Sequence, residues 1–137
     1  KMETMRERLT LILTLDNLEF AFLSGRITAM QRTLSSLLKV KPIVVLRDGL
    51  LVIGDKVRTR QKALDRVLDT VAERIGERAA HVAVVHAADP SAAQELSRRI
   101  REMIHIKDLI ITALSIPVAA NLGPGAIGIV AFPVDEE

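Results

Sequence analysis

The 137-residue chain contains no cysteine, no tryptophan and no tyrosine, and its only aromatic residues are three phenylalanines. Without cysteine it can form no disulfide, thiolate metal site or cysteine nucleophile, so its stability has to come from packing. With so few aromatic rings it lacks the stacking platforms on which single-stranded nucleic acids bind. These absences argue against a nucleic-acid partner.

Long hydrophobic runs and a strong excess of one charge are also missing. No apolar run approaches the roughly 18 residues of a membrane-spanning helix, and no basic-plus-apolar leader opens the chain. The formal net charge is only +2, from 19 basic and 17 acidic side chains, which produces little phosphate-attracting field. We therefore predict a cytoplasmic protein with no membrane span.

The chain does have a high apolar content, with 49% hydrophobic and 26% charged residues. This composition is typical of a folded globular protein, and the length suits one domain with a sizeable core. The sequence opens at Lys1 within a helix-like segment. We therefore expect residues 1–137 to form a single domain that is a piece of a longer protein.

Hydrophobic spacing predicts alternating strands and helices. Period-two alternation, β-branched runs and the Asp48-Gly49 hairpin signal predict strands over residues 9–15, 43–46, 50–53, 82–85, 109–114 and 126–132. Helical spacing and capping residues predict two short helices between Leu18 and Lys41, a long helix over about Thr59–Gly76, and a helix from Pro90 whose core stripe ends at Met103. Pro117 and a glycine-rich turn are expected to separate the last two strands. The predicted fold class is α/β, a mixed sheet of about six strands with helices packed on it.

Histidines are the natural candidates for catalysis or metal binding in a chain without cysteine. His81, His86 and His105 form no i, i+4 pair and have no acidic cluster near them, so we predict no metal site and no cofactor. His86 ends a predicted buried strand, where ligands often lie in α/β sheets. It is either a base or ligand contact, or a half-buried histidine bonded to a loop carbonyl.

Glycine-rich and basic segments have simple structural interpretations. The segment Gly123–Gly128 is followed by strand-forming residues, whereas a dinucleotide-binding loop needs a helix after its glycines. We interpret it as a tight turn into a strand, with Gly128 allowing close backbone approach. The basic clusters at residues 58–62 and 98–101 have acidic residues interleaved with them, as solvated helix faces do.

Arg26 differs from the other arginines because it lies at a glycine corner between two predicted helices. A guanidinium in that position can hold a carboxylate or a phosphate through two hydrogen bonds. The alternative is an ordinary solvated surface arginine.

Several segments, taken together, resemble the C-terminal domain of the DegV family, the bacterial fatty-acid-binding proteins that act as carrier subunits of fatty acid kinase. The matching segments, in the same order and with similar spacing, are Leu23–Thr28, Ser36–Ile43, Asp48-Gly49, Lys56–Ala63 and Gly123–Gly128. The resemblance extends from about Leu9 to Phe132.

The resemblance implies a lipid-binding module that is not an enzyme. With an N-terminal domain, which this chain is expected to lack, it would enclose one long-chain fatty acid and present the carboxylate to the catalytic subunit of fatty acid kinase. Head-group contacts are implied for Arg26 and for Asn121, which stands where the family usually has a histidine and which carries no charge. Further ligand-channel or turn contacts are implied for Ile27, Thr28, Met30, Leu122 and Gly123. An isolated half would expose its apolar ligand-facing side and favour self-association.

Two other functions remain open from the sequence. The broad fold-level likeness of this family to dihydroxyacetone kinases suggests an enzyme with His86 as nucleophile, although a phosphate loop and a partner base are missing from the sequence. A structural or regulatory domain that has lost ligand binding is the other alternative, and Asn121 is compatible with it.

Overall fold

The computed structural model describes residues 9–16 and 40–134, apart from the side chain of Asn121. The two helices predicted between Leu18 and Lys41 lie outside the described residues, except that Lys41 itself opens a strand. Four of the candidate site residues also lie outside them: Arg26, Ile27, Thr28 and Met30.

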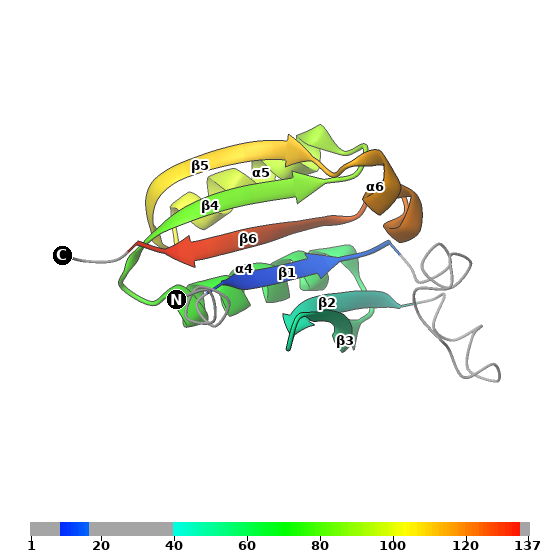
Figure 1. Cartoon of the computed structure of the whole chain (residues 1–137), viewed down its shortest axis with the longest axis horizontal. Helices are drawn as coiled ribbons and strands as arrows, with labels where there is room; N and C mark the ends of the chain where they lie inside the picture. The colour runs from blue at the N-terminus through cyan, green and yellow to red at the C-terminus, as the bar shows by residue number, and fades with distance from the viewer. Residues whose placement is uncertain (1–8, 17–39, 135–137) are drawn as a thin grey trace.

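A six-stranded mixed sheet forms the centre of the described structure, in the order β3-β2-β1-β6-β4-β5 (Figure 1). The strands are β1 (Thr10–Thr14), β2 (Lys41–Arg47), β3 (Leu50–Val57), β4 (Ala79–His86), β5 (His105–Ala113) and β6 (Ile127–Pro133). Neighbouring strands are antiparallel except β4 and β5, which are parallel. The predicted α/β fold with about six strands is confirmed.

The β2–β3 hairpin turns at the predicted Asp48-Gly49 pair. Both residues have positive φ, 54° for Asp48 and 80° for Gly49, which is the conformation that makes Asp-Gly a hairpin signal. The register pairs Arg47 with Leu50 directly across the turn. The hairpin prediction is therefore confirmed by the backbone geometry on which it depended.

Two long helices begin at the capping residues that the sequence indicates. Helix α4 (Arg60–Ile75) begins after Thr59, whose side chain accepts a hydrogen bond from the Lys62 amide. Helix α5 (Pro90–Arg101) begins after Asp89, whose carboxylate accepts one from the Ala92 amide. These bonds satisfy amides that have no partner within the helix.

The prediction that Met103 belongs to the core stripe of α5 is wrong, because this side chain is 41% exposed. The helix ends at Arg101, and the amides of Glu102 and Met103 turn back to the carbonyls of Arg99 and Ile100. This tighter turn takes Met103 off the apolar stripe. The next residue, Ile104, is 8% exposed and joins the core instead.

A third helix, α6 (Ile116–Leu122), lies between the last two strands, where the sequence predicts only a separation by Pro117 and a glycine-rich turn. Pro117 lies in its first turn, where a proline costs little because amides there have no partner within the helix. The Gly123 amide closes the helix with a 2.8 Å bond to the Ala119 carbonyl. The sequence does not predict α6 because proline is a signal both for a helix break and for the first turn of a helix.

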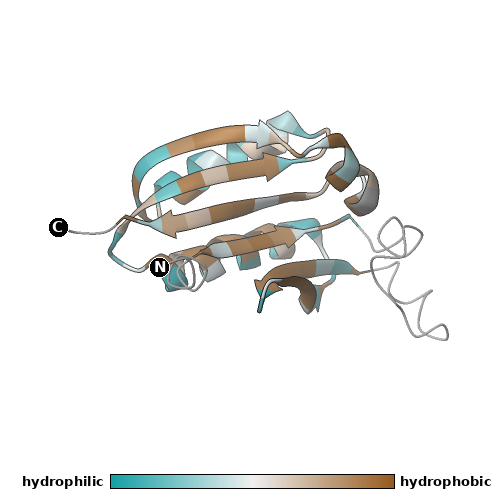
Figure 2. Ribbon diagram, viewed as in Figure 1, coloured by the Kyte–Doolittle hydropathy of each residue, from teal (hydrophilic) through white to brown (hydrophobic). Residues whose placement is uncertain are grey.

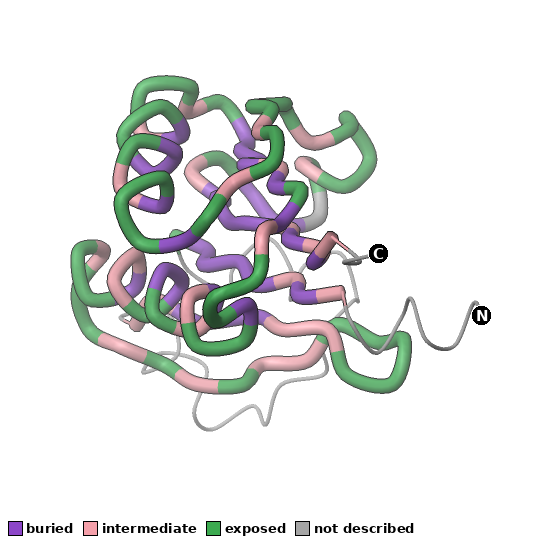
Figure 3. Tube along the Cα trace, turned by 90° about the vertical axis from the view of Figure 1, so that its left-hand side faces the viewer, coloured by how far each residue is buried: buried purple, intermediate pink, exposed green. Residues whose placement is uncertain are grey.

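The two faces of the sheet are covered differently (Figures 1 and 3). Helices α4 and α5 pack against one face and bury the larger core with it. Its sheet residues include Ile12, Ile43, Val82, Val84, Ile127 and Ile129. The opposite face contributes to a smaller buried cluster near one end of the sheet, formed by Leu13, Leu15, Val44, Val85, Ala87, Leu122 and Ala126. Within residues 9–16 and 40–134, no helix has the length and apolar character needed to cross a membrane.

Candidate functional site

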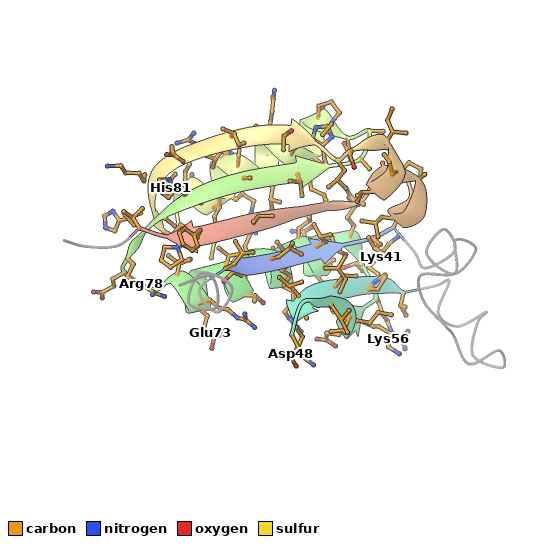
Figure 4. The ribbon with its side chains drawn as sticks, in the orientation of Figure 1. Lys41, Asp48, Lys56, Glu73, Arg78 and His81 are labelled. Carbon is orange, nitrogen blue, oxygen red and sulfur yellow. The ribbon has the colours of Figure 1, made fainter. Side chains whose placement is uncertain are left out.

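Polar side chains from several elements lie close together along the edge of the sheet that is formed by strand ends, where β1 and β4 end and β6 begins. Strands β1 and β4 are both antiparallel to β6, so their carboxyl ends meet the start of β6 at the same edge. The side chains there, together with the turn Gly123–Gly125, are called the strand-end row: Asp16, Lys41, Arg60, His86 and Asp89. Figure 4 labels Lys41, which lies beside the end of β1.

Lys41 ties the beginning of β2 to the end of β1. Its ammonium group donates to the Asp16 main-chain carbonyl at 3.0 Å and lies 3.2 Å from the Asp16 carboxylate. Nearby, the buried Thr14 hydroxyl donates to the Pro42 carbonyl at 3.0 Å. The segment that carries Arg26 therefore leaves the described structure and re-enters it at the strand-end row.

Arg60 joins three elements through its guanidinium. Its Nη1 donates to the Gly125 carbonyl at 3.0 Å and its Nη2 donates to the Asp89 carboxylate at 2.9 Å. The side chains of Arg60 and Asp89 are 30% and 34% exposed. The sequence pattern at residues 58–62 predicts a solvated helix face. This is wrong for Arg60, although the other four residues are exposed.

His86 is 8% exposed and lies at the end of β4. Its Nδ1 accepts a 3.1 Å hydrogen bond from the Asp89 amide, so it binds a loop N–H group and not the loop carbonyl that one interpretation expected. With the Nδ1 lone pair engaged, the neutral ring carries its proton on Nε2. That nitrogen then has no lone pair for attack on a substrate, which disfavours the enzyme alternative built on His86.

The Gly123–Gly125 turn leads into β6 and not into a helix, as the sequence indicates. Gly123 and Gly125 have φ values of +93° and +89°, which glycine adopts without strain. The Gly125 amide donates to the Ala87 carbonyl at 2.9 Å, and the Ala87 amide donates to the Ala126 carbonyl at 2.8 Å. This turn is thus hydrogen-bonded to the residue that follows His86.

Three predicted site residues belong to this edge. Asn121 is in the last turn of α6, Leu122 ends that helix, and Gly123 is its C-cap. Leu122 is 9% exposed and packs in the smaller cluster, so in the described structure it is a core residue next to the row. The contacts proposed for these residues with a ligand stay predictions.

The sequence pattern predicts Asp89 only as a helix cap and indicates no role for Arg60 or Lys41 at this edge. A cap signal can be read locally, but the partners of Arg60 lie 65 and 29 residues away in the chain. No spacing rule connects positions so far apart.

The chemistry available here is that of an anion or amide contact beside an apolar interior. The strand-end row lies next to the smaller cluster, where Leu15 and Ala126 are completely buried. The described ranges contain no group of three or more histidine, aspartate or glutamate side chains able to hold a metal ion. Such an edge suits an amphipathic ligand with a polar head and an apolar tail.

Comparison with known proteins agrees with the family resemblance. A family model described as "Uncharacterised protein, DegV family" matches residues 1–134. A DegV domain-containing protein of Streptomyces coelicolor is 35% identical over 116 residues, which are 84% of this chain and 41% of that protein. One of Halalkalibacterium halodurans is 32% identical over 129 residues, which are 93% and 46% of the two chains. The chain thus spans less than half the length of these relatives.

Solved structures show the same fold. A fatty-acid-binding DegV family protein of Streptococcus agalactiae has a TM-score of 0.84 and 24% identity, covering 98% of this chain and 48% of that one. A fatty-acid-binding DegV family protein of Thermus thermophilus has a TM-score of 0.85 and 23% identity, covering 97% and 48%. The Streptococcus pneumoniae Fatty Acid Kinase B3 protein, loaded with linoleic acid, has a TM-score of 0.76 and 20% identity, covering 98% and 47%.

Proposed function

The chain belongs to the DegV family, and we propose that it is the C-terminal half of a cytoplasmic fatty-acid carrier. With a second, N-terminal domain it would enclose one long-chain fatty acid and present the carboxylate to the catalytic subunit of a fatty acid kinase. The relatives named for fatty acid binding and for a fatty acid kinase subunit support this proposal. The protein itself would make and break no bond.

The observation that carries the proposal is the strand-end row lying directly beside the smaller apolar cluster. Burial of a fatty acid tail contributes about 0.8 kcal/mol per methylene, whereas its carboxylate is costly to bury without a donor. A bound fatty acid needs both kinds of surface next to each other. In our proposal, the strand-end row provides the polar surface, and the partly buried side chains packed against the smaller cluster, such as Leu11 and Ala83, provide the apolar surface.

The described cations of the row are already paired, which narrows the choice of head-group donor. Lys41 is bonded to Asp16 and Arg60 is bonded to Asp89. An incoming carboxylate therefore needs another positive group, and we assign that role to Arg26, with Asn121 as a neutral amide donor. Leu122 and Gly123 would complete this side of the site.

We also assign Ile27, Thr28 and Met30, which lie outside the described residues, as ligand-channel contacts of the fatty acid tail or as turn contacts. The described residues Asp16, directly before the segment that contains these three residues, and Lys41, shortly after it, both belong to the strand-end row and are bonded to each other. This connection supports the assignment.

The decisive experiment is mass spectrometry of an organic extract from the purified full-length protein that contains this chain. We expect about one long-chain fatty acid per protein. An empty extract, followed by no uptake of added palmitic acid, would contradict the carrier function and support a structural or regulatory domain.

A paired variant tests the head-group assignment in the same full-length protein. Arg26→Ala should weaken palmitic acid binding and leave Tm nearly unchanged. The control is Arg47→Ala, which removes an exposed arginine at the far end of β2 and should change neither quantity. A fall in Tm for Arg26→Ala without a specific loss of binding would show that Arg26 is structural.

A further inference from the structure

We propose that Arg60 is a positioning residue that clamps the Gly123–Gly125 turn in the shape required for ligand binding. The inference rests on the proposed function, because the turn and the end of α6 contribute to the proposed head-group site. Among residues 9–16 and 40–134, Arg60 is the one side chain that hydrogen-bonds to this turn.

The Gly123–Gly125 turn has enough backbone freedom for a side-chain clamp to affect its shape. Two of its three residues are glycines at positive φ, and glycine has the largest backbone freedom to lose on folding. Pro124 between them is exposed and donates no amide hydrogen bond. The Gly123 amide is bonded to the Ala119 carbonyl and the Gly125 amide to the Ala87 carbonyl, and Arg60 holds the carbonyl at the end of the turn, that of Gly125.

Asp89 and His86 hold the guanidinium in place. One Asp89 oxygen accepts from Arg60 at 2.9 Å, the other accepts from the Ala92 amide at 3.3 Å, and the Asp89 amide donates to His86 Nδ1. Asp89 is thus held by α5 and by β4, and it holds Arg60 of α4 in turn. A planar guanidinium can serve Asp89 and Gly125 at once, whereas the point charge of lysine is not shaped for two such partners.

The ion pair with Asp89 also distinguishes the positioning role of Arg60 from that of a residue that binds the head group. The carboxylate of Asp89 neutralises Arg60 locally, so the pair adds orientation and little net positive charge to the edge. A second arginine–aspartate ion pair between α4 and α5 provides a matched control. Arg99 of α5 donates to Asp65 of α4 at 2.6 Å, with side-chain exposures of 33% and 44%, but it does not bond to the turn.

The test compares Arg60→Gln, Arg60→Lys, Asp89→Asn and Arg99→Gln in the full-length protein. Three quantities are measured for each variant. They are the Kd for palmitic acid by displacement of a pyrene-labelled fatty acid, the Tm, and the hydrogen-exchange rates of the Gly123 and Gly125 amides by NMR. Asp89→Asn keeps a residue that caps α5 well and removes both the charge and one of the two acceptor oxygens that bind Arg60 and the Ala92 amide.

For Arg60→Gln we expect the Kd to rise about ten-fold, which corresponds to about 1.4 kcal/mol, and both glycine amides to exchange faster. Arg60→Lys should show most of this loss at nearly unchanged Tm, and Asp89→Asn a smaller part. Arg99→Gln should leave the Kd and both exchange rates unchanged.

Equal effects of Arg60→Gln and Arg99→Gln would overturn the proposal, as would unchanged exchange of both amides in Arg60→Lys and Arg60→Gln. Failure of the proposed function would look different, because the wild-type protein would then bind no palmitic acid. The amide exchange rates would still decide whether Arg60 holds the turn.

Discussion

The two faces of the sheet carry similar side chains but are covered very differently. On the face below α4 and α5, Ile12, Val84 and Ile129 are at most 1% exposed. On the other face, the adjacent residues Leu11, Ala83 and Val130 are only partly buried, although their side chains are apolar too. The strands are hydrophobic over most of their length (Figure 2). An apolar face needs a cover. In our proposal, the fatty acid and the second domain provide it.

The two edge strands of the sheet, β3 and β5, show the same difference more strongly on this second face. The register places Leu51 of β3 and Ile110 of β5 on it, and these side chains are 50% and 59% exposed. A side chain of the same type therefore contributes differently to the free energy of unfolding on each face. Substitutions that compare the faces directly can test this.

The largest effect is expected from Gly128→Ala, which would break the contact between β1 and β6 on the second face. A Cβ at this position would collide with the Ile12 carbonyl oxygen and would lie 2.7 Å from Leu13 Cα. Because both are backbone atoms, the strands would have to separate. We expect a loss of about 4 kcal/mol in the free energy of unfolding, or no folding at all, measured by urea denaturation.

The control is Gly54→Ala in β3, whose Cβ would come closest to the Val45 side chain, at 3.3 Å, and would lie 3.9 Å from the nearest backbone atom, the Ile43 carbonyl oxygen. That substitution should cost less than about 1 kcal/mol. Similar costs at the two glycines would show that the close approach at Gly128 does not constrain the fold.

A second comparison places one residue type on both faces. Ile129→Ala empties a fully buried position below the helices, whereas Ile110→Ala shortens a side chain that is 59% exposed. We expect losses of about 2–5 kcal/mol and less than about 0.5 kcal/mol, respectively. If urea denaturation gave equal losses for the two variants, the second face would be as well covered as the first.

The exposed face also predicts self-association of the 137-residue chain. The double variant with Leu51→Ser and Ile110→Ser should shift the chain toward monomer in sedimentation velocity, because it removes apolar surface from both edges of the face. The matched control is Met103→Ser, which removes an exposed side chain after α5. An equal shift with the control would mean that association does not depend on this face.

The smallest effect is expected on the solvent-exposed side of α5, which belongs to neither face of the sheet. The hydrogen bond from Arg98 holds the pKa of Glu95 below its ordinary value. A carboxylate with a lowered native pKa stabilises the fold above its unfolded pKa, and this stabilisation is lost as the pH falls through the native pKa. Glu95→Gln should therefore slightly flatten the acid side of the stability curve.

The control for this prediction is Glu73→Gln on α4. Glu73 points outward (Figure 4) and makes no ion pair with another described residue. Urea denaturation at several acidic pH values compares the two variants. An identical change in slope for both would show that the Arg98 contact is not responsible.

Much of the fold could be predicted because its signals are local. Thr59 and Asp89 cap helices, and Asp48-Gly49 turns a hairpin, through bonds and dihedral angles within a few residues. The wrong predictions come from places where the local signal was ambiguous. Pro117 suits both a loop and a first helical turn, and Met103 lies where a helical period continues past the end of the helix.

The candidate site was less predictable than the fold for a related reason. The glycine turn and the position of Asn121 beside it can be read from adjacent residues, and so can the burial expected of His86. The role of Arg60 cannot, because its sequence neighbours are exposed charged and polar residues like those of any solvated helix face.

The sequence by itself determined the periodicity of strands and helices, the caps, the tight turns and the family, since each depends on neighbouring residues or on an ordered set of motifs. The tertiary structure alone decided that β6 lies between β1 and β4. That strand order brings Gly125 to Arg60 and places Asp89 beside both. Contacts between distant residues arise from packing all elements into one sheet, and no local pattern encodes them.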